Sequence, residues 1–201
     1  MSGIVQGGSS SGRLAVVTQK LQAFRRRYYL NLVLRGSVIL VLLGVSLGVA
    51  FTLSEGYFWL STQWRTLLVQ SWIATMVGVF GWWVVRPGLQ YLNLTRTLTD
   101  TEAARLIGQH FPEIQDQLLN LLQLGQTDAQ TAGSVDLLLA SIEQKTEKFR
   151  PIPFYLAVNF TPNWRLARYI AVPLLLLLFF YFISPDVVTK GSYRLVNYSE
   201  H

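Results

Sequence analysis

Apolar residues are gathered into three long blocks along this chain of 201 residues. The first block covers residues 36–53 and the second covers residues 67–85, and neither contains a charged side chain. Each is close to the ~20 residues that an α-helix needs to cross the hydrocarbon core of a bilayer. The pattern therefore predicts two transmembrane helices joined by a short link.

The third block, residues 169–183, is shorter and would extend only ~22 Å as an α-helix, against a hydrocarbon core of ~30 Å. The preceding residues 164–168 can lengthen it, because their two arginines can reach the headgroups while the residues between them are apolar. Five consecutive leucines followed by "FFYF" leave no polar face. This favours a third span, kinked at Pro173, over the alternative of a buried helix in a soluble domain.

Between the second and third blocks lies a segment with the composition of a soluble protein, residues 86–168, called the insert below. It contains eight basic and eight acidic side chains. We expect Pro87 and Gly88 to end the second span. Thr99 and Glu102 have the spacing of a capping box and predict the start of a helix, and Pro112 fits the first turn of the next one.

An apolar stripe runs along these two helices at intervals of three and four residues. The third expected helix of the insert, residues 135–149, offers a complementary face. The two faces predict a helical hairpin, with an interface made by Ile107, Phe111, Ile114, Leu118, Leu121, Leu122, Leu138 and Ile142. The alternative is that the stripe meets a partner chain, either another protein or a second copy of this one.

Small residues in the first two blocks indicate where helices can approach each other closely. Gly44 and Gly48 form a GxxxG motif in the first block, and Gly78 and Gly81 lie in the second. Glycine allows backbones to touch in lipid, where apolar burial gives no driving force. We expect these four residues to be helix-packing positions, within the chain ahead of between chains, although glycine is also simply frequent in membrane helices.

The distribution of charge predicts the topology. Residues 1–36 carry six basic side chains and no acidic one, whereas the link between the first two blocks has one of each. By the positive-inside rule the amino terminus and the insert are cytoplasmic and the carboxyl end is periplasmic. Arginines beside the first span are expected to contact lipid headgroups: Arg25, Arg26, Arg27 and Arg35. This placement also argues against nucleic-acid binding as the reason for the net charge of +6.

Motifs for catalysis or cofactor binding are absent from the sequence. There is no cysteine, phosphate-binding glycine loop, HExxH or GxSxG motif. His110, Glu113 and Asp116 come closest to a metal site, but Pro112 interrupts their helix and these residue types are common on solvated faces. We therefore expect no enzymatic activity, no cofactor, no metal and no small-molecule substrate.

One long motif carries a resemblance to a known family. The stretch "TEAARLIGQHFPEIQDQLLNLLQL", with "LLLASIEQKTEKFRPIPF" and "PDVVTKGSYRLVNY", resembles the amino-terminal part of large Bacteroidota envelope proteins with domain of unknown function 4175. The resemblance covers about residues 15–200. It implies a three-span inner-membrane anchor that leads into a long periplasmic region, so residues 191–201 are expected to begin a β-strand of that region.

Together these patterns predict an all-α membrane protein with three transmembrane helices and a cytoplasmic helical hairpin. The expected parts are a basic cytoplasmic segment (1–35), a transmembrane hairpin (36–85), the insert (86–168), a third span (169–185) and a periplasmic tail (186–201). The expected function is a non-enzymatic anchor and scaffold in the bacterial inner membrane. The alternative is an accessory structural subunit of a larger membrane complex.

Overall fold

The computed structural model describes residues 8–95, 98–126 and 151–198, and in these ranges the chain is helical with no β-strand. Three helical stretches are long and apolar enough to cross a membrane: Val17–Phe58, Thr62–Tyr91 and Phe154–Ile183. This confirms the prediction of an all-helical protein with three such helices. The most apolar window of the third is 0% buried among the described residues.

The chain divides into two compact units. The first unit consists of Met1–Tyr29 and Gln90–Asn159, and the second of Leu30–Leu89 and Phe160–His201. Helix α1, Gly8–Phe58, contributes residues to both units. Each unit is described separately below.

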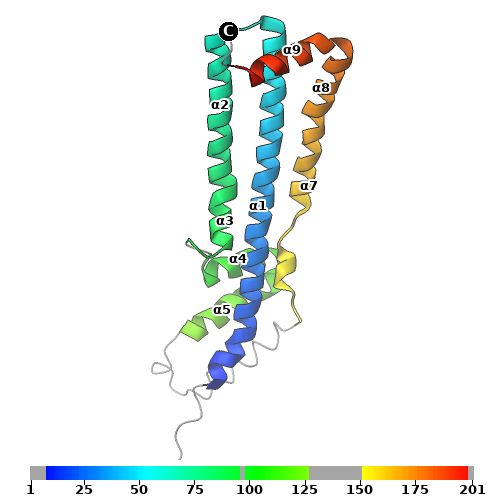
Figure 1. The fold of residues 1–201 in the computed structure, drawn as a ribbon. Helices are drawn as coiled ribbons and strands as arrows, with labels where there is room; N and C mark the ends of the chain where they lie inside the picture. Colours follow the sequence, from blue (N-terminus) through cyan, green and yellow to red (C-terminus); the bar gives the residue numbers. More distant parts are fainter. Residues whose placement is uncertain (1–7, 96–97, 127–150, 199–201) are drawn as a thin grey trace, which may run out of the picture. The chain divides into compact units, whose positions relative to one another are not determined.

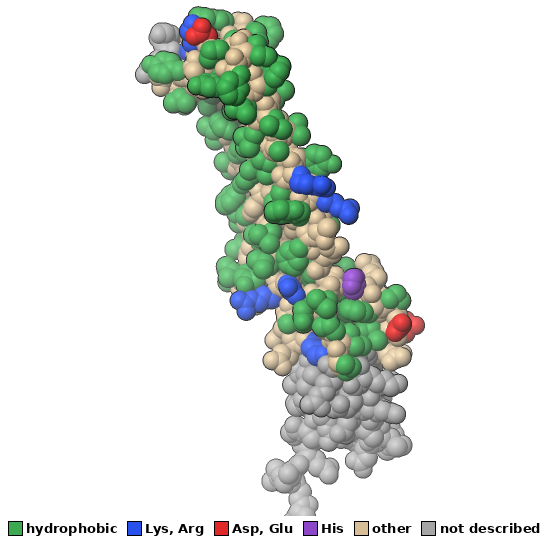
Figure 2. Space-filling model, turned by 90° about the vertical axis from the view of Figure 1, so that its right-hand side faces the viewer, with side chains coloured by type: hydrophobic (Ala, Val, Ile, Leu, Met, Phe, Trp, Pro, Cys, Tyr) green, Lys and Arg blue, Asp and Glu red, His purple; other side chains and the backbone are tan. Residues whose placement is uncertain are grey.

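In the second unit, α1 is followed by α2 (Thr62–Phe80), and the two helices run side by side in opposite directions (Figure 1). Met76 and Trp72 of α2 lie against Gly44 and Gly48 of α1. Hydrophobic side chains cover much of the exposed surface of these helices (Figure 2), as expected for helices surrounded by lipid instead of water.

The second apolar helix does not end at Pro87, contrary to the sequence prediction. A π-helical turn, η1 (Gly81–Val85), leads without a break into α3 (Arg86–Tyr91). In this wide turn the Arg86 N–H donates to the Gly81 carbonyl, which makes room for the proline ring one residue later. Pro87 has no N–H to donate to the Trp83 carbonyl, and that carbonyl instead lies against Gly36 of α1, where a Cβ would overlap it.

The third apolar stretch is assembled from α7 (Thr161–Ala167), the 3-10 turn η4 (Arg168–Ile170) and α8 (Ala171–Ile183). Residues 164–168 thus extend the helix, as the sequence predicted. The irregular turn lies just before Pro173, which lacks the N–H that would bond to the Tyr169 carbonyl. Near its start, the Asn163 amide donates to the Asn31 side chain of α1 at 2.6 Å, and near its end Phe180 packs edge-on against Tyr57.

The last helix of the described chain, α9 (Pro185–Val196), replaces the expected β-strand at residues 191–196. Pro185 at its first turn and the Asp186–Lys190 ion pair at i,i+4 spacing explain why this segment is helical. It packs on α1 through two glycines. A Cβ on Gly191 would overlap the Thr52 carbonyl, and a Cβ on Gly56 would overlap the Val187 carbonyl.

This close approach of α9 to α1 predicts that Gly191→Ala lowers the melting temperature of the purified chain in detergent. The added methyl forces α9 away from α1, an overpacking that costs ~1–3 kcal/mol and outweighs the gain in helix propensity. Gly78→Ala is the matched control, because nothing lies within 4 Å of a Cβ at that position. It should leave the melting temperature unchanged or raise it. Equal effects of both substitutions would show that the α1–α9 contact is not tight.

Candidate functional site: the insert docked on the first helix

The first unit is organised around one face of α1. Val17, Leu21 and Phe24 recur at intervals of four and three residues and are each no more than 1% exposed. Their polar neighbours, among them Thr18, Gln19 and Gln22, are exposed. This part of α1 precedes the first apolar block, so the face is an apolar docking surface outside the predicted span.

Two helices of the insert pack on each other. Helix α4 (Asp100–His110) turns at η2 (Pro112–Ile114) into α5 (Gln115–Gln126), and α4 packs on α5. Gly108 permits this turn, because a Cβ there would overlap the Gln115 side chain. The start of α4 has the predicted capping box, with Thr99 accepting from the Glu102 N–H at 3.2 Å and Glu102 accepting from the Thr99 N–H at 2.8 Å.

Most residues of the predicted apolar stripe lie where α4 packs on α5. Ile107, Ile114 and Leu118 are buried, and Phe111 and Leu122 are half-buried. The side chain of Leu121, and the partner residues Leu138 and Ile142, lie outside the described residues. The predicted pairing with residues 135–149 therefore stays a prediction, while the packing of α4 on α5 was not foreseen.

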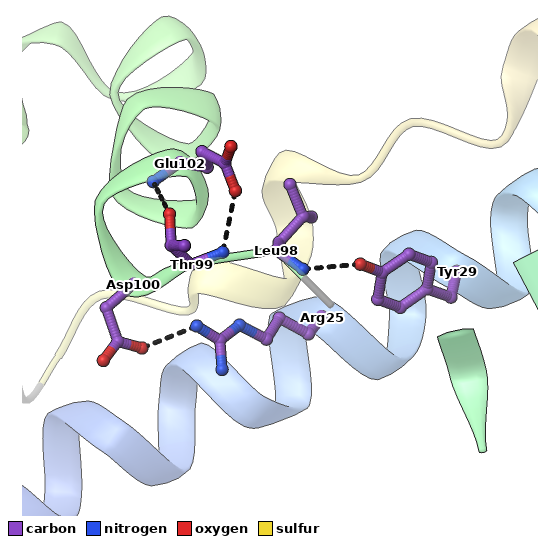
Figure 3. A network of polar contacts seen from close by, with 6 residues as sticks. All are labelled: Arg25, Tyr29, Leu98, Thr99, Asp100 and Glu102. Carbon is purple, nitrogen blue, oxygen red and sulfur yellow. Dashed lines mark hydrogen bonds and ion pairs between the residues drawn. The ribbon is translucent and has the colours of Figure 1, made fainter. Parts of the chain in front are cut away.

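The amino-terminal end of the insert is tied to α1 by two polar contacts (Figure 3). Arg25 binds Asp100 at 2.7 Å, and the Tyr29 hydroxyl accepts from the Leu98 N–H at 2.7 Å. Asp100 stands in the first turn of α4, where a carboxylate is also favoured by the helix dipole. These contacts fix the start of α4 next to the docking surface.

The carboxyl-terminal end of the insert reaches the same stretch of α1. The Lys20 ammonium donates to the Ile152 carbonyl at 2.9 Å and lies 5.6 Å from the ring centroid of Phe154. Phe154, in the 3-10 turn η3 (Phe154–Ala157), is 1% exposed. Arg27 stacks over Tyr155 at 4.9 Å. Both ends of the insert are therefore held by residues 20–29 of α1.

The arginines expected at lipid headgroups are engaged with protein in three of four cases. Besides the contacts of Arg25 and Arg27, Arg26 donates from Nε to the Tyr91 hydroxyl at 2.8 Å. Arg35 is exposed and has no polar contact with any described residue. Sequence analysis missed these partners, because each lies more than 60 residues away along the chain. Their contact with headgroups stays a prediction.

The four predicted helix-packing glycines divide into two pairs in the second unit. Gly44 lies 3.3 Å from Met76 Sδ, and Gly48 lies 3.6 Å from the Trp72 ring, both measured from an added Cβ. A Cβ added at Gly78 or Gly81 meets no described residue within 4 Å, so within the described chain these two do not pack on the first span. Their packing between chains stays a prediction. The tight contacts are instead made by Gly36, Gly56 and Gly191.

A buried ion pair lies next to the Gly56–Gly191 contact and was also missed. Glu55 of α1 is 0% exposed, and Arg194 Nε of α9 stands 3.1 Å from its Oε1. The Arg194 guanidinium also stacks over Trp59 at 5.0 Å. A buried carboxylate is costly unless a cation pairs with it, so α9 supplies the charge that Glu55 requires.

The residues considered for a metal site are on the surface of the insert. His110 and Glu113 are exposed, as is Asp116, and the His110 ring packs edge-on against Phe111 at 4.9 Å. Among the residues that the structure describes, no three metal-binding side chains come together.

No protein-family model matches the chain, and no curated protein or solved structure matches it either. The resemblance to the Bacteroidota envelope proteins therefore stays a prediction.

The docking geometry predicts that Tyr29→Phe loosens the insert. The substitution leaves the Leu98 N–H without its acceptor, at a cost of ~1–3 kcal/mol. Amide exchange at Leu98 and along α4 should become faster, and trypsin should cut more readily at Arg105. Tyr28→Phe is the control, since the Tyr28 hydroxyl makes no hydrogen bond with the described residues. If the two variants exchange alike, the Tyr29 hydroxyl does not hold the insert.

Proposed function

We propose that the chain is an anchor and scaffold of the bacterial inner membrane, with its amino terminus and insert in the cytoplasm and its carboxyl end in the periplasm. The observation that carries the proposal is that residues 20–29 of α1 hold both ends of the insert, while the same helix continues through the first apolar block, residues 36–53. A docked domain on a span is what an anchor requires.

The charge distribution supports the orientation. Six basic side chains precede the first apolar block, and the insert contacts four of them, Lys20, Arg25, Arg26 and Arg27. Basic residues resist translocation, so these contacts and the insert belong on the cytoplasmic side. Trp59 and Trp64 lie between the first two apolar blocks, and both are more than 60% exposed. They fit the belt of aromatic residues expected at the periplasmic membrane interface.

The second candidate is an accessory structural subunit of a larger membrane complex. It is favoured by exposed apolar side chains outside the spans, of which Leu92 and Leu94 are 62% and 68% exposed. An accessory subunit would leave the membrane in mild detergent in a fixed ratio with other chains. An anchor would be recovered alone or as part of its own longer chain.

Labelling of single cysteines in intact cells tests the proposed topology, and the chain has no native cysteine to interfere. An impermeant maleimide should label Ser61→Cys and Ser192→Cys, whose native side chains are exposed. It should not label Ser9→Cys or Gln126→Cys until the membrane is permeabilised. Labelling at 126 but not at 61 contradicts the proposal.

A further inference from the structure

A polar hollow of about 560 Å³ lies in the first unit and takes no part in docking the insert's apolar face. One wall is a single face of α1, formed by Gln22, Arg25, Arg26 and Tyr29 at intervals of three and four residues. The opposite wall is the end of α3 and the turn that follows it, formed by Gln90, Tyr91 and Asn93. Every lining side chain carries a hydrogen-bonding group, so the hollow suits a polar ligand.

Both arginines have donors that bond to none of the described residues. Arg25 binds Asp100 through Nη2, whereas its Nε is buried and has no hydrogen-bond partner in the described part of the chain. Arg26 is held by its Nε bond to the Tyr91 hydroxyl and by the Tyr91 ring, 5.6 Å from its guanidinium carbon. These two contacts fix the orientation of the Arg26 guanidinium group. The two terminal nitrogens of that group bond to none of the described residues. A buried N–H without an acceptor is unfavourable, and a ligand oxygen would relieve it.

The charge of the hollow specifies the ligand further. Among the described residues, its lining contains two guanidinium groups and no carboxylate, and Asp100 neutralises one of them from outside the lining. The described side chains thus leave one positive charge. Guanidinium groups bind phosphate oxygens through paired hydrogen bonds, and a phosphodiester carries one negative charge. We propose that this hollow is a binding site for a phosphodiester, supplied by the headgroup of an anionic phospholipid.

The choice of a lipid as the source rests on the proposed function, in which the apolar helices cross the membrane. Arg26 precedes Leu30, the first of several apolar residues that lead into the first block, by four residues, or ~6 Å of helix. Tyr91 follows Val85, the end of the second block, by six residues of continuous helix, or ~9 Å. The headgroup layer is ~5–8 Å thick on each side, so both walls fall at about the depth of lipid phosphates.

The full chain in micelles of a zwitterionic detergent, titrated with phosphatidylglycerol or phosphatidylcholine, tests this site. We expect phosphatidylglycerol to bind at least tenfold more tightly than phosphatidylcholine, measured by native mass spectrometry. Arg26→Gln should weaken phosphatidylglycerol binding about tenfold, the loss of one charge-assisted bidentate contact. Tyr91→Phe removes the hydroxyl that orients the Arg26 guanidinium group and leaves the charge unchanged. It should weaken phosphatidylglycerol binding less than Arg26→Gln does, but measurably.

Arg27→Gln is the matched control, because it removes the same charge one residue further along α1, outside the hollow. In about 0.5 M salt, which screens exposed charges, it should change binding less than twofold. Equal losses for Arg26→Gln and Arg27→Gln would overturn the site in favour of general electrostatic attraction. Retention of binding in Tyr91→Phe and Arg26→Gln would overturn it as well.

Inorganic phosphate distinguishes the two sources of a phosphate group. If the ligand is a lipid, millimolar phosphate should neither raise the melting temperature nor displace phosphatidylglycerol. Stabilisation by phosphate alone, lost in Arg26→Gln, would overturn the lipid assignment. Sedimentation of each variant with the membrane fraction is checked first. A wild-type chain absent from that fraction contradicts the proposed function, whereas correct insertion without a preference for phosphatidylglycerol contradicts only this site.

Discussion

The attachment of the insert to residues 17–29 of α1 is the constraint on which the first unit depends. These residues are distant in sequence from both ends of the insert, with separations of 75 residues for Arg25–Asp100 and 132 for Lys20–Ile152. Contacts over such separations carry a large loop-closure cost in a free chain. Here the ends of the insert are continuous with the second and third apolar helices, and tethering by membrane spans would reduce that cost. The polar contacts then fix the start of α4 and the segment around Ile152 beside α1.

Packing in the second unit follows a different rule, because burial of apolar surface gives little driving force between helices in lipid. Close approach of backbones replaces it. Gly36 admits the Trp83 carbonyl freed by Pro87, and Gly56 and Gly191 let α9 lie on α1. The Glu55–Arg194 ion pair beside them adds specificity, since removing either partner leaves a charge that the other was compensating.

Local rules made much of this fold predictable. The three apolar helices, the Thr99–Glu102 capping box and the helix start at Pro112 follow from length, periodicity and side-chain chemistry within a few residues. The failures arose where tertiary contacts decide. Pro87 was expected to end a helix, but a π turn and the space over Gly36 accommodate it. The partners of the arginines depend on contacts that no local pattern encodes, and the contact expected at Gly78 and Gly81 depends on which face of α2 meets α1. Helix α9 was missed although Pro185 and the Asp186–Lys190 spacing are local signals for it.

The insert is docked in cis on α1 through the Arg25–Asp100 ion pair and the contacts beside it. Exchanging the charges of Arg25 and Asp100 tests it most directly, with amide hydrogen exchange along Asp100–His110 as the measurement. Arg25→Asp and Asp100→Arg should each speed exchange, because each places like charges in contact. The double variant should restore protection toward the wild-type level. A double variant that exchanges as fast as the single ones would contradict the docking of the insert on this face of α1.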